Sequence, residues 1–319
     1  MNKKIIPIFF AVDNNYAPFL SVVIESIKAN CSMDYIYKLH VLNNDITPEF
    51  KHLIEKYNSD NIEIEFFSIT KRLEELKTTL KLRDYYTNAI YYRLFIPELF
   101  PQYSKVLYLD ADIVILDDIS KLYEEDVDNY CLGVVRDDVI SLCNEFKDYT
   151  IKALGIANEK YFNSGILVMN LDKMREHHIL NKFLYMIPNF QFVVAPDQDF
   201  LNILCKDKVK YLNTNWNFAP LNNAQFNDDV KLIHFKLTAK PWHYDNIQGG
   251  DKFWLYADKT DFKYYLQNLL TTYSNESKEK DNQVEENLRK LCIKEIERIS
   301  EYQKVNGDFQ TIIEGIINE

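Results

Sequence analysis

The chain has 319 residues, of which 47% are hydrophobic, 14% aromatic and 27% charged, and its formal net charge is −11. This composition is typical of a globular protein with a sizeable core and excludes a mostly disordered chain. The acidic balance argues against a nucleic-acid-binding protein, which normally carries a basic excess.

The N-terminal segment MNKKIIPIFFAVDNNY imitates a signal peptide but is interpreted as a first strand. Its apolar run is short, and Asp13, Asn14 and Asn15 stand where a cleavage site of small residues would begin. Five cysteines without a Cys-x-x-Cys pair predict reduced, mostly buried thiols and a cytoplasmic protein. No stretch is long and apolar enough to span a membrane, so we expect at most peripheral membrane contact. The oligomeric state is left open.

Strand-like and helix-like patterns alternate along the first three quarters of the chain. Helical spacing of apolar residues begins at Tyr16, a second helix is predicted to start at Thr47 and Pro48, and a third covers 87–96 and ends before Pro97. The predicted strands are 5–12, 38–42, 62–67, 105–109, 131–135, 165–170 and 231–235. Such alternation predicts an α/β fold with a mostly parallel central sheet flanked by helices, and ligands at the carboxyl ends of its strands.

The C-terminal part of the chain has a different texture. From about residue 278 it is dense in charge, with Val284, Leu288 and Leu291 on one face of a predicted helix. Acidic residues offset the basic ones there, which favours a helix packed on the domain over one lying on a membrane surface. We therefore predict a main domain at 1–255 and a helical extension at 256–319.

Two carboxylates, Asp110 and Asp112, interrupt the apolar segment KVLYLDADIVIL at 105–116. On an extended segment, side chains two residues apart point the same way, and burial of unpaired carboxylates is costly. A hard divalent cation would neutralise both. His234 at the end of a predicted strand adds a nitrogen ligand, and this donor set suits Mn²⁺ or Mg²⁺. Lys240 follows six residues later and is suited to binding phosphate.

Six segments together resemble, in order, the signature blocks of glycosyltransferase family 8, which includes bacterial lipooligosaccharide galactosyltransferases and glycogenin. They are FFAVDNNY, YYRLFIPELFP, KVLYLDADIVI, YFNSGILVMNL, PDQDFLN and HFKLTAKPWH. The resemblance covers roughly residues 5–245. It implies a GT-A fold, a UDP-hexose donor, Mn²⁺, retention of anomeric configuration and a glycan or glycolipid acceptor.

The resemblance also implies roles for single residues. Asp110, Asp112 and His234 match the metal ligands. The implied donor-binding residues are Ala11, Asp13, Asn15, Tyr16, Arg93, Asp110, Asn163, Ser164, Gly165 and Lys240. Among them, Tyr16 would stack on uracil and Asp13 would accept a hydrogen bond from its N–H. Asp197 and Gln198 match catalytic residues beside the sugar, and Asp137 matches a carboxylate on the acceptor side.

The implied chemistry is open at one point. Retention needs either a covalent intermediate or attack from the face that the leaving group departs from. Gln198 is a poor nucleophile, which favours same-face attack, with Asp197 and Asp137 as the alternative nucleophiles. The resemblance also has one departure: the glycine usual three residues after the metal-binding histidine is Leu237 here.

Other interpretations of these residues exist. Taken singly, Asp13 fits a helix cap, Tyr16 a core aromatic and Arg93 a structural ion pair. The segment YLDADIV also fits phosphatases of the haloacid dehalogenase type, in which Asp110 would be the nucleophile. A non-catalytic sugar-nucleotide-binding protein and a self-glycosylating protein are further alternatives. The sequence does not distinguish glucose from galactose as the donor sugar, nor does it identify the acceptor.

Overall fold

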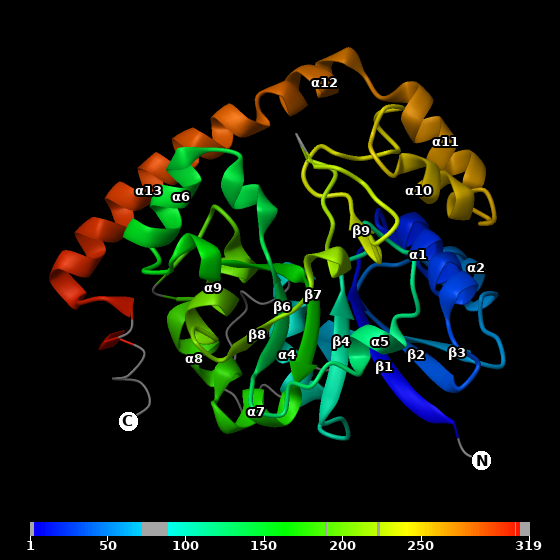
Figure 1. Cartoon of the computed structure of the whole chain (residues 1–319), viewed down its shortest axis with the longest axis horizontal. Coiled ribbons are helices and arrows are strands. Elements are labelled where there is room, and N and C mark those ends of the chain that lie inside the picture. The colour runs from blue at the N-terminus through cyan, green and yellow to red at the C-terminus, as the bar shows by residue number, and fades with distance from the viewer. Residues whose placement is uncertain (1–2, 72–88, 189, 222–223, 310, 313–319) are drawn as a thin grey trace.

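The computed structural model describes residues 3–71, 89–188, 190–221, 224–309 and 311–312 (Figure 1). The strands of its central sheet are β1 (Lys4–Ala11), β2 (Tyr35–Asn43), β3 (Ile62–Ser68), β4 (Lys105–Leu109), β6 (Leu132–Arg136), β7 (Phe162–Asn170) and β8 (Val209–Tyr211). They lie in the order β3-β2-β1-β4-β7-β6-β8. β7 is antiparallel to β4 and β6, and the other strand pairs of this sheet are parallel. The predicted α/β fold with a mostly parallel sheet is confirmed.

Helices cover both faces of this sheet and extend beyond it (Figure 1). The α-helices are α1 (Ala17–Asn30), α2 (Pro48–Glu55), α4 (Tyr92–Leu99), α5 (Ser120–Tyr123), α6 (Asn144–Lys152), α7 (Leu171–Glu176), α8 (Ile179–Met186), α9 (Pro196–Leu204), α10 (Gly250–Ala257), α11 (Lys263–Thr272), α12 (Asn275–Asn282) and α13 (Val284–Asn306). The 3₁₀ turns are η1 (Ala89–Tyr91), η2 (Asp138–Ser141), η3 (Asn158–Lys160) and η4 (Thr214–Trp216).

Local signals in the sequence place several of these elements. Thr47 caps α2, since its side chain accepts a hydrogen bond from the N–H of Phe50 at 3.3 Å, as predicted. The prediction that Pro97 stops the helix before it is wrong. Pro97 lies inside α4, where it removes one backbone hydrogen bond, and the helix ends at Leu99 soon afterwards. The predicted start of this helix at 87–88 lies outside the described residues.

The last predicted strand is present but does not belong to the central sheet. It forms β9 (Leu232–His234), which pairs with β5 (Ile113–Ile115) in a two-stranded antiparallel sheet. The apolar side chains of both strands are fully or almost fully buried, so each covers the other from water. The pairing sets Ile113 opposite His234 and therefore brings this histidine to the end of β4.

The core divides between the two faces of the central sheet. In β4, Val106 and Tyr108 belong to one buried cluster, and Leu107 and Leu109 belong to the other. This is the alternation expected when successive side chains of a strand point to opposite faces. Both faces are apolar because helices cover both, as expected for a largely parallel sheet.

Helices α11, α12 and α13 form an arch from the side of α1 to the side of α6 (Figure 1). α13 packs along α6 and buries Cys292, Glu295 and Ile299. Within the described parts of the chain, no helix combines the length and hydropathy that a membrane crossing needs. The division of the chain near residue 255 stays a prediction.

Asp199 shows how the first turn of α9 is held in the core. Its carboxylate accepts hydrogen bonds from the hydroxyls of Tyr149 at 2.8 Å and Tyr161 at 2.6 Å, and it is completely buried. Burial raises the pKa of Asp199 from 3.8 to about 7, although both tyrosines counteract the rise. Asp199 is therefore protonated over much of the acidic range in the folded protein.

We predict that the raised pKa of Asp199 makes stability fall as the pH rises. Between about pH 4 and pH 7 the unfolded state releases this proton and the folded state keeps it, so ionisation favours unfolding. The Asp199→Asn variant lacks this penalty. The unfolding free energy of the variant minus that of the wild type should therefore be larger at pH 7.5 than at pH 4.5, by roughly 1–4 kcal/mol. Urea unfolding of both proteins at both pH values measures this change. The same variant-minus-wild-type value at the two pH values would contradict the prediction.

Candidate active site

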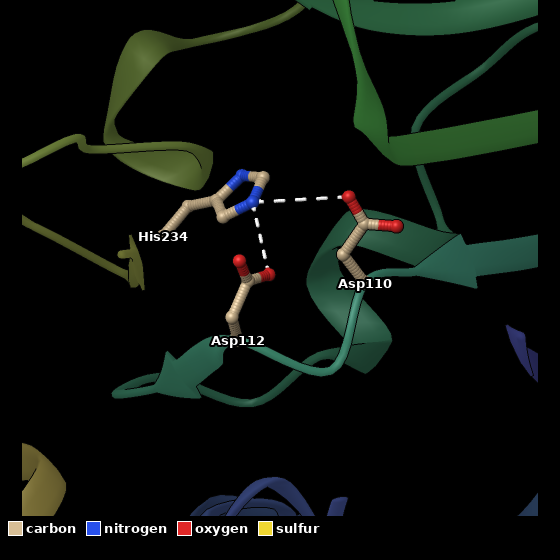
Figure 2. Close-up of side chains that lie close together, drawn as sticks. All are labelled: Asp110, Asp112 and His234. Carbon is tan, nitrogen blue, oxygen red and sulfur yellow. Dashed lines mark ion pairs between the residues drawn. The ribbon is translucent and has the colours of Figure 1, made fainter. Parts of the chain in front are cut away.

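Asp110, Asp112 and His234 converge at the carboxyl end of β4 (Figure 2). The Nε2 atom of His234 lies 3.2 Å from an oxygen of Asp112 and 3.8 Å from an oxygen of Asp110. Backbone hydrogen bonds fix the arrangement: the N–H of Asp110 donates to the carbonyl of Gly165 at 2.8 Å, and that of Phe235 donates to the carbonyl of Asp112 at 2.9 Å. The predicted proximity of these three side chains is therefore seen.

Gly165 in β7 leaves the space that this convergence needs. A Cβ atom at this position would lie 2.5 Å from the Cε1 atom of His234 and still nearer to an oxygen of Asp110. Both contacts are shorter than van der Waals distances allow. The missing side chain of Gly165 thus makes room for two of the candidate metal ligands.

A chain of buried amides orients His234. Its Nδ1 atom lies 3.0 Å from the side-chain oxygen of Asn217, and the amide nitrogen of Asn217 donates to Asn163 at 2.9 Å. Asn217 therefore accepts the Nδ1–H of the histidine, which turns Nε2 toward the carboxylates. The sequence did not single out Asn217, because Asn213 and Asn215 lie close before it and no sequence feature distinguishes the three asparagines.

A positively charged side chain lies beside each of the two carboxylates, Asp110 and Asp112. Lys240 donates to Asp112 at 2.6 Å, and it also donates to the carbonyl of Phe235. Burial alone would raise the pKa of Asp112, but Lys240 and His234 hold it well below its usual range. Arg93 donates to Asp110 at 3.1 Å and lies 3.2 Å from Asp197. Asp112 is therefore held in its ionised form.

A second polar cluster lies around Gln198 in α9. Its side-chain oxygen accepts hydrogen bonds from the Asn163 side chain and from the Ser164 N–H, each at 3.0 Å, and its nitrogen donates to Asp137 at 2.8 Å. Lys236 lies 3.2 Å from Asp137, and both are buried. Burial would raise the pKa of Asp137, but Lys236 and the hydrogen bonds outweigh it and lower the pKa. Lys236 was also missed from the sequence, where it stands between residues matched to the family.

Two cavities meet at the carboxylates. The first, of about 310 Å³, is lined by Ala11, Val12, Asp13, Tyr16, Ile90, Arg93, Asp110, Ala111 and Asp112. The second, of about 300 Å³, shares Ile90, Arg93, Asp110 and Asp112 with the first. It is lined further by Asp137, Asn163, Ser164, Asp197, Gln198, His234 and Lys236, among others. Most of the residues singled out in the sequence thus lie on one of two adjoining cavities.

Some predicted residues have another place or a second role. Asn15 is exposed and is not among the described residues that line either cavity. Asp13 accepts the N–H of Tyr16 at 2.9 Å and so caps the turn before α1. Tyr16 is 39% exposed, lines the cavity and belongs to neither buried cluster. Leu237 has a φ of 50°, the left-handed conformation that glycine adopts most readily.

The donor atoms of Asp110, Asp112 and His234 suit a divalent cation. One atom from each side chain lies within 4.8 Å of the others. Two carboxylates and an imidazole nitrogen, with the other ring nitrogen held by Asn217, are a donor set for Mn²⁺ or Mg²⁺. Asp199, in contrast, faces Tyr149 and Tyr161 in the core and takes no part in this cluster.

Comparison with known proteins gives a consistent picture. The family model described as Glycosyl transferase family 8 matches residues 7–246. A Haemophilus influenzae protein whose name places it among the glycosyltransferases is 31% identical over 249 residues, which are 77% of this chain and 72% of that protein. The lipopolysaccharide 1,2-glucosyltransferase of Escherichia coli K12 is 27% identical, over 73% of this chain and 72% of its own.

A solved structure is also similar. The galactosyltransferase LgtC, in complex with donor and acceptor sugar analogues, aligns with a TM-score of 0.60 and 28% identity. The alignment covers 80% of this chain and 96% of LgtC. The fold is therefore of the GT-A type, and the chain belongs to glycosyltransferase family 8.

Proposed function

We propose that the protein is a retaining, metal-dependent hexosyltransferase that moves glucose or galactose from a UDP-sugar to a glycan or glycolipid acceptor. The observation that carries this proposal is the position of Asp110, Asp112 and His234 where two cavities adjoin. A donor diphosphate at this point would extend its nucleotide into one cavity and its sugar into the other. Synthesis of a cell-surface polysaccharide or lipooligosaccharide in the cytoplasm would employ such a reaction.

The first cavity suits the nucleotide. Tyr16 is exposed enough to stack on uracil, since base–aromatic stacking needs an accessible ring face. Only one oxygen of Asp13 is needed to cap the turn before α1, so the other is available to the uracil N–H. Ala11 contributes a small side chain to the same wall. Asn15 is exposed and directly precedes Tyr16, which lines this cavity, so Asn15 would reach the ribose from the rim.

The phosphates would lie between the cavities. Asp110, Asp112 and His234 would hold a cation, Mn²⁺ or Mg²⁺, whose positive charge stabilises the diphosphate as it leaves. Lys240 now pairs with Asp112, and its flexible stem would allow the ammonium group to turn to a phosphate oxygen. The hexose would then face Arg93, Ser164 and Asp197 in the second cavity.

The arrangement around Gln198 favours attack from the face that UDP departs from. Its amide is held on both sides, by Asn163 and Ser164 through the oxygen and by Asp137 through the nitrogen. An amide tied in this way orients the sugar and does not act as a nucleophile. Asp197 accepts the Ser164 hydroxyl at 2.8 Å and faces Arg93, which suits a hydrogen-bonding role at the sugar hydroxyls.

The relatives support a saccharide acceptor. One is named as a lipopolysaccharide glucosyltransferase, and the similar solved structure is a galactosyltransferase. The phosphatase alternative has no support from the family match.

One assay distinguishes the proposed transferase from a non-catalytic protein and from a self-glycosylating one. UDP-glucose and UDP-galactose, each with Mn²⁺ and no acceptor, should show slow UDP release, and intact mass would reveal any sugar attached to the protein.

We predict that Asp112→Asn abolishes metal-dependent turnover. The substitution removes a charged ligand with little change in shape, so activity should fall by at least about 100-fold while the fold is kept. UDP release from UDP-hexose and calorimetric titration of Mn²⁺ in the presence of UDP measure the two effects. Asp138→Asn changes an exposed carboxylate in the same region and serves as the matched control. Wild-type activity that survives EDTA would contradict a metal-dependent mechanism.

We predict that Asn217→Ala weakens metal binding although Asn217 is not a ligand. Loss of its carbonyl frees the Nδ1–H of His234, so the imidazole is no longer held in the ligating orientation. The affinity for Mn²⁺ should fall by about 10- to 100-fold. The control is Asn215→Ala, two residues earlier in η4. If both variants bind Mn²⁺ like the wild type, Asn217 does not orient the histidine.

We predict an α-glycoside from a UDP-α-hexose, and a Gln198→Ala variant that is slow but active. An orienting amide can be lost without loss of the bond-forming group, whereas loss of a nucleophile would stop the reaction. The proton spectrum of freshly formed product shows the configuration through its anomeric coupling. A large coupling, as in a β-gluco or β-galacto linkage, would overturn the retaining assignment.

A further inference from the structure

Helix α13 contributes a residue to the second cavity. Leu288 lies in the lining beside residues from the ends of the central strands, although it is far from them in the sequence. It stands one helical turn before Cys292, and Glu295 and Ile299 continue the same buried stripe. This stripe packs α13 along α6 (Figure 1), so the position of Leu288 is set by a packed helix.

The second cavity has an apolar side as well as a polar one. Its larger apolar lining residues come from several separate segments: Ile90, Val139, Phe146, Val194, Leu237 and Leu288. Phe146 belongs to α6, the helix on which α13 lies, so Phe146 and Leu288 bring two packed helices to the same cavity. Pockets for small molecules commonly combine such apolar walls with a few polar groups that fix orientation.

Among the described residues on the polar side, the charges away from the candidate metal ligands are paired, as in Arg93 with Asp197. Asp137 is paired with Lys236 at 3.2 Å, and both side chains are buried. The second oxygen of Asp137 accepts the amide of Gln198. A charged acceptor would meet a neutral ion pair and an apolar wall there, and burial of an unpaired charge is costly.

We propose that Leu288 of α13, backed by the buried Phe146, forms the wall against which a neutral pyranoside acceptor packs. The acceptor would place the C–H face of its ring on Leu288 and turn hydroxyls toward Asp137 and Gln198. The C-terminal helix is then part of the acceptor site and determines specificity there. This inference rests on the proposed function, because it assigns the acceptor for the same reaction.

The test compares Leu288→Ala and Leu288→Asp with Ile293→Ala and Ile293→Asp. Ile293 lies on the same helix but is 48% exposed, so its variants control for changes to α13 itself. UDP release from UDP-glucose and UDP-galactose is measured with Mn²⁺, first alone and then with methyl β-glucoside, methyl β-galactoside or methyl β-lactoside. Methyl β-glucuronide is the charged comparison. Calorimetric titration with UDP checks that each variant keeps its donor site.

The wild type should show UDP release that a neutral pyranoside stimulates more than the glucuronide does. Leu288→Ala should lower kcat/KM for that pyranoside by roughly tenfold, as for small losses in an apolar pocket, and Leu288→Asp should lower it further. The Leu288 variants should bind UDP with the wild-type affinity, and the Ile293 variants should have the wild-type kcat/KM for the pyranoside.

Three results would overturn the inference. The first is preference for the glucuronide, the second is hydrolysis by the wild type that none of the neutral pyranosides stimulates, and the third is equal behaviour of the Leu288 and Ile293 variants. In each of these the transferase remains supported by its donor hydrolysis. If the wild type releases no UDP from any UDP-hexose, the proposed function itself fails and the acceptor assignment with it.

Discussion

The site depends on the close approach of β7 to the segment that links β4 with β5. Two carboxylates and an imidazole converge there, and the space for them exists because Gly165 has no side chain. Three residue pairs between β5 and β9 set the position of His234. A short two-stranded sheet is marginal alone, so its burial against the rest of the protein is what keeps the imidazole in place. The geometry of the site therefore depends directly on core packing in this part of the fold.

Much of this architecture follows from patterns along the chain. The alternation of apolar strands and amphipathic helices predicts the α/β sheet, and the Asp110–Asp112 spacing predicts that both carboxylates face one point. The place of His234 at a predicted strand end, together with the family resemblance, predicts that it is the third ligand. Asn217 and Lys236 were missed because their roles depend on partners that are distant in sequence: Lys236 lies 99 residues from Asp137. An isolated amide or lysine carries no periodic signal that would reveal such a partner.

Leu237 adopts a backbone conformation that favours glycine, the residue that the family usually has at this position. The family usually has glycine here, and the chain keeps the left-handed conformation with a leucine at a cost of about 1–2 kcal/mol. Neighbouring backbone hydrogen bonds hold the turn, among them Lys236 N–H to His234 at 2.8 Å and Lys240 N–H to Thr238 at 2.8 Å. The side chain, 41% exposed, then lies at the cavity where a glycine would leave it open.

The buried amides join the two halves of the site into one hydrogen-bonded unit. His234 donates to Asn217, Asn217 donates to Asn163, Asn163 donates to Gln198, and Gln198 donates to Asp137. Every donor in this series points the same way, so reversal of one amide would leave its neighbours facing like atoms. Free-energy changes from substitutions at opposite ends will therefore be non-additive, with coupling of about 0.5–3 kcal/mol in a double-mutant cycle. In evolutionary terms, Asn217 beside the candidate metal ligands and Gln198 beside Asp137 should therefore change together.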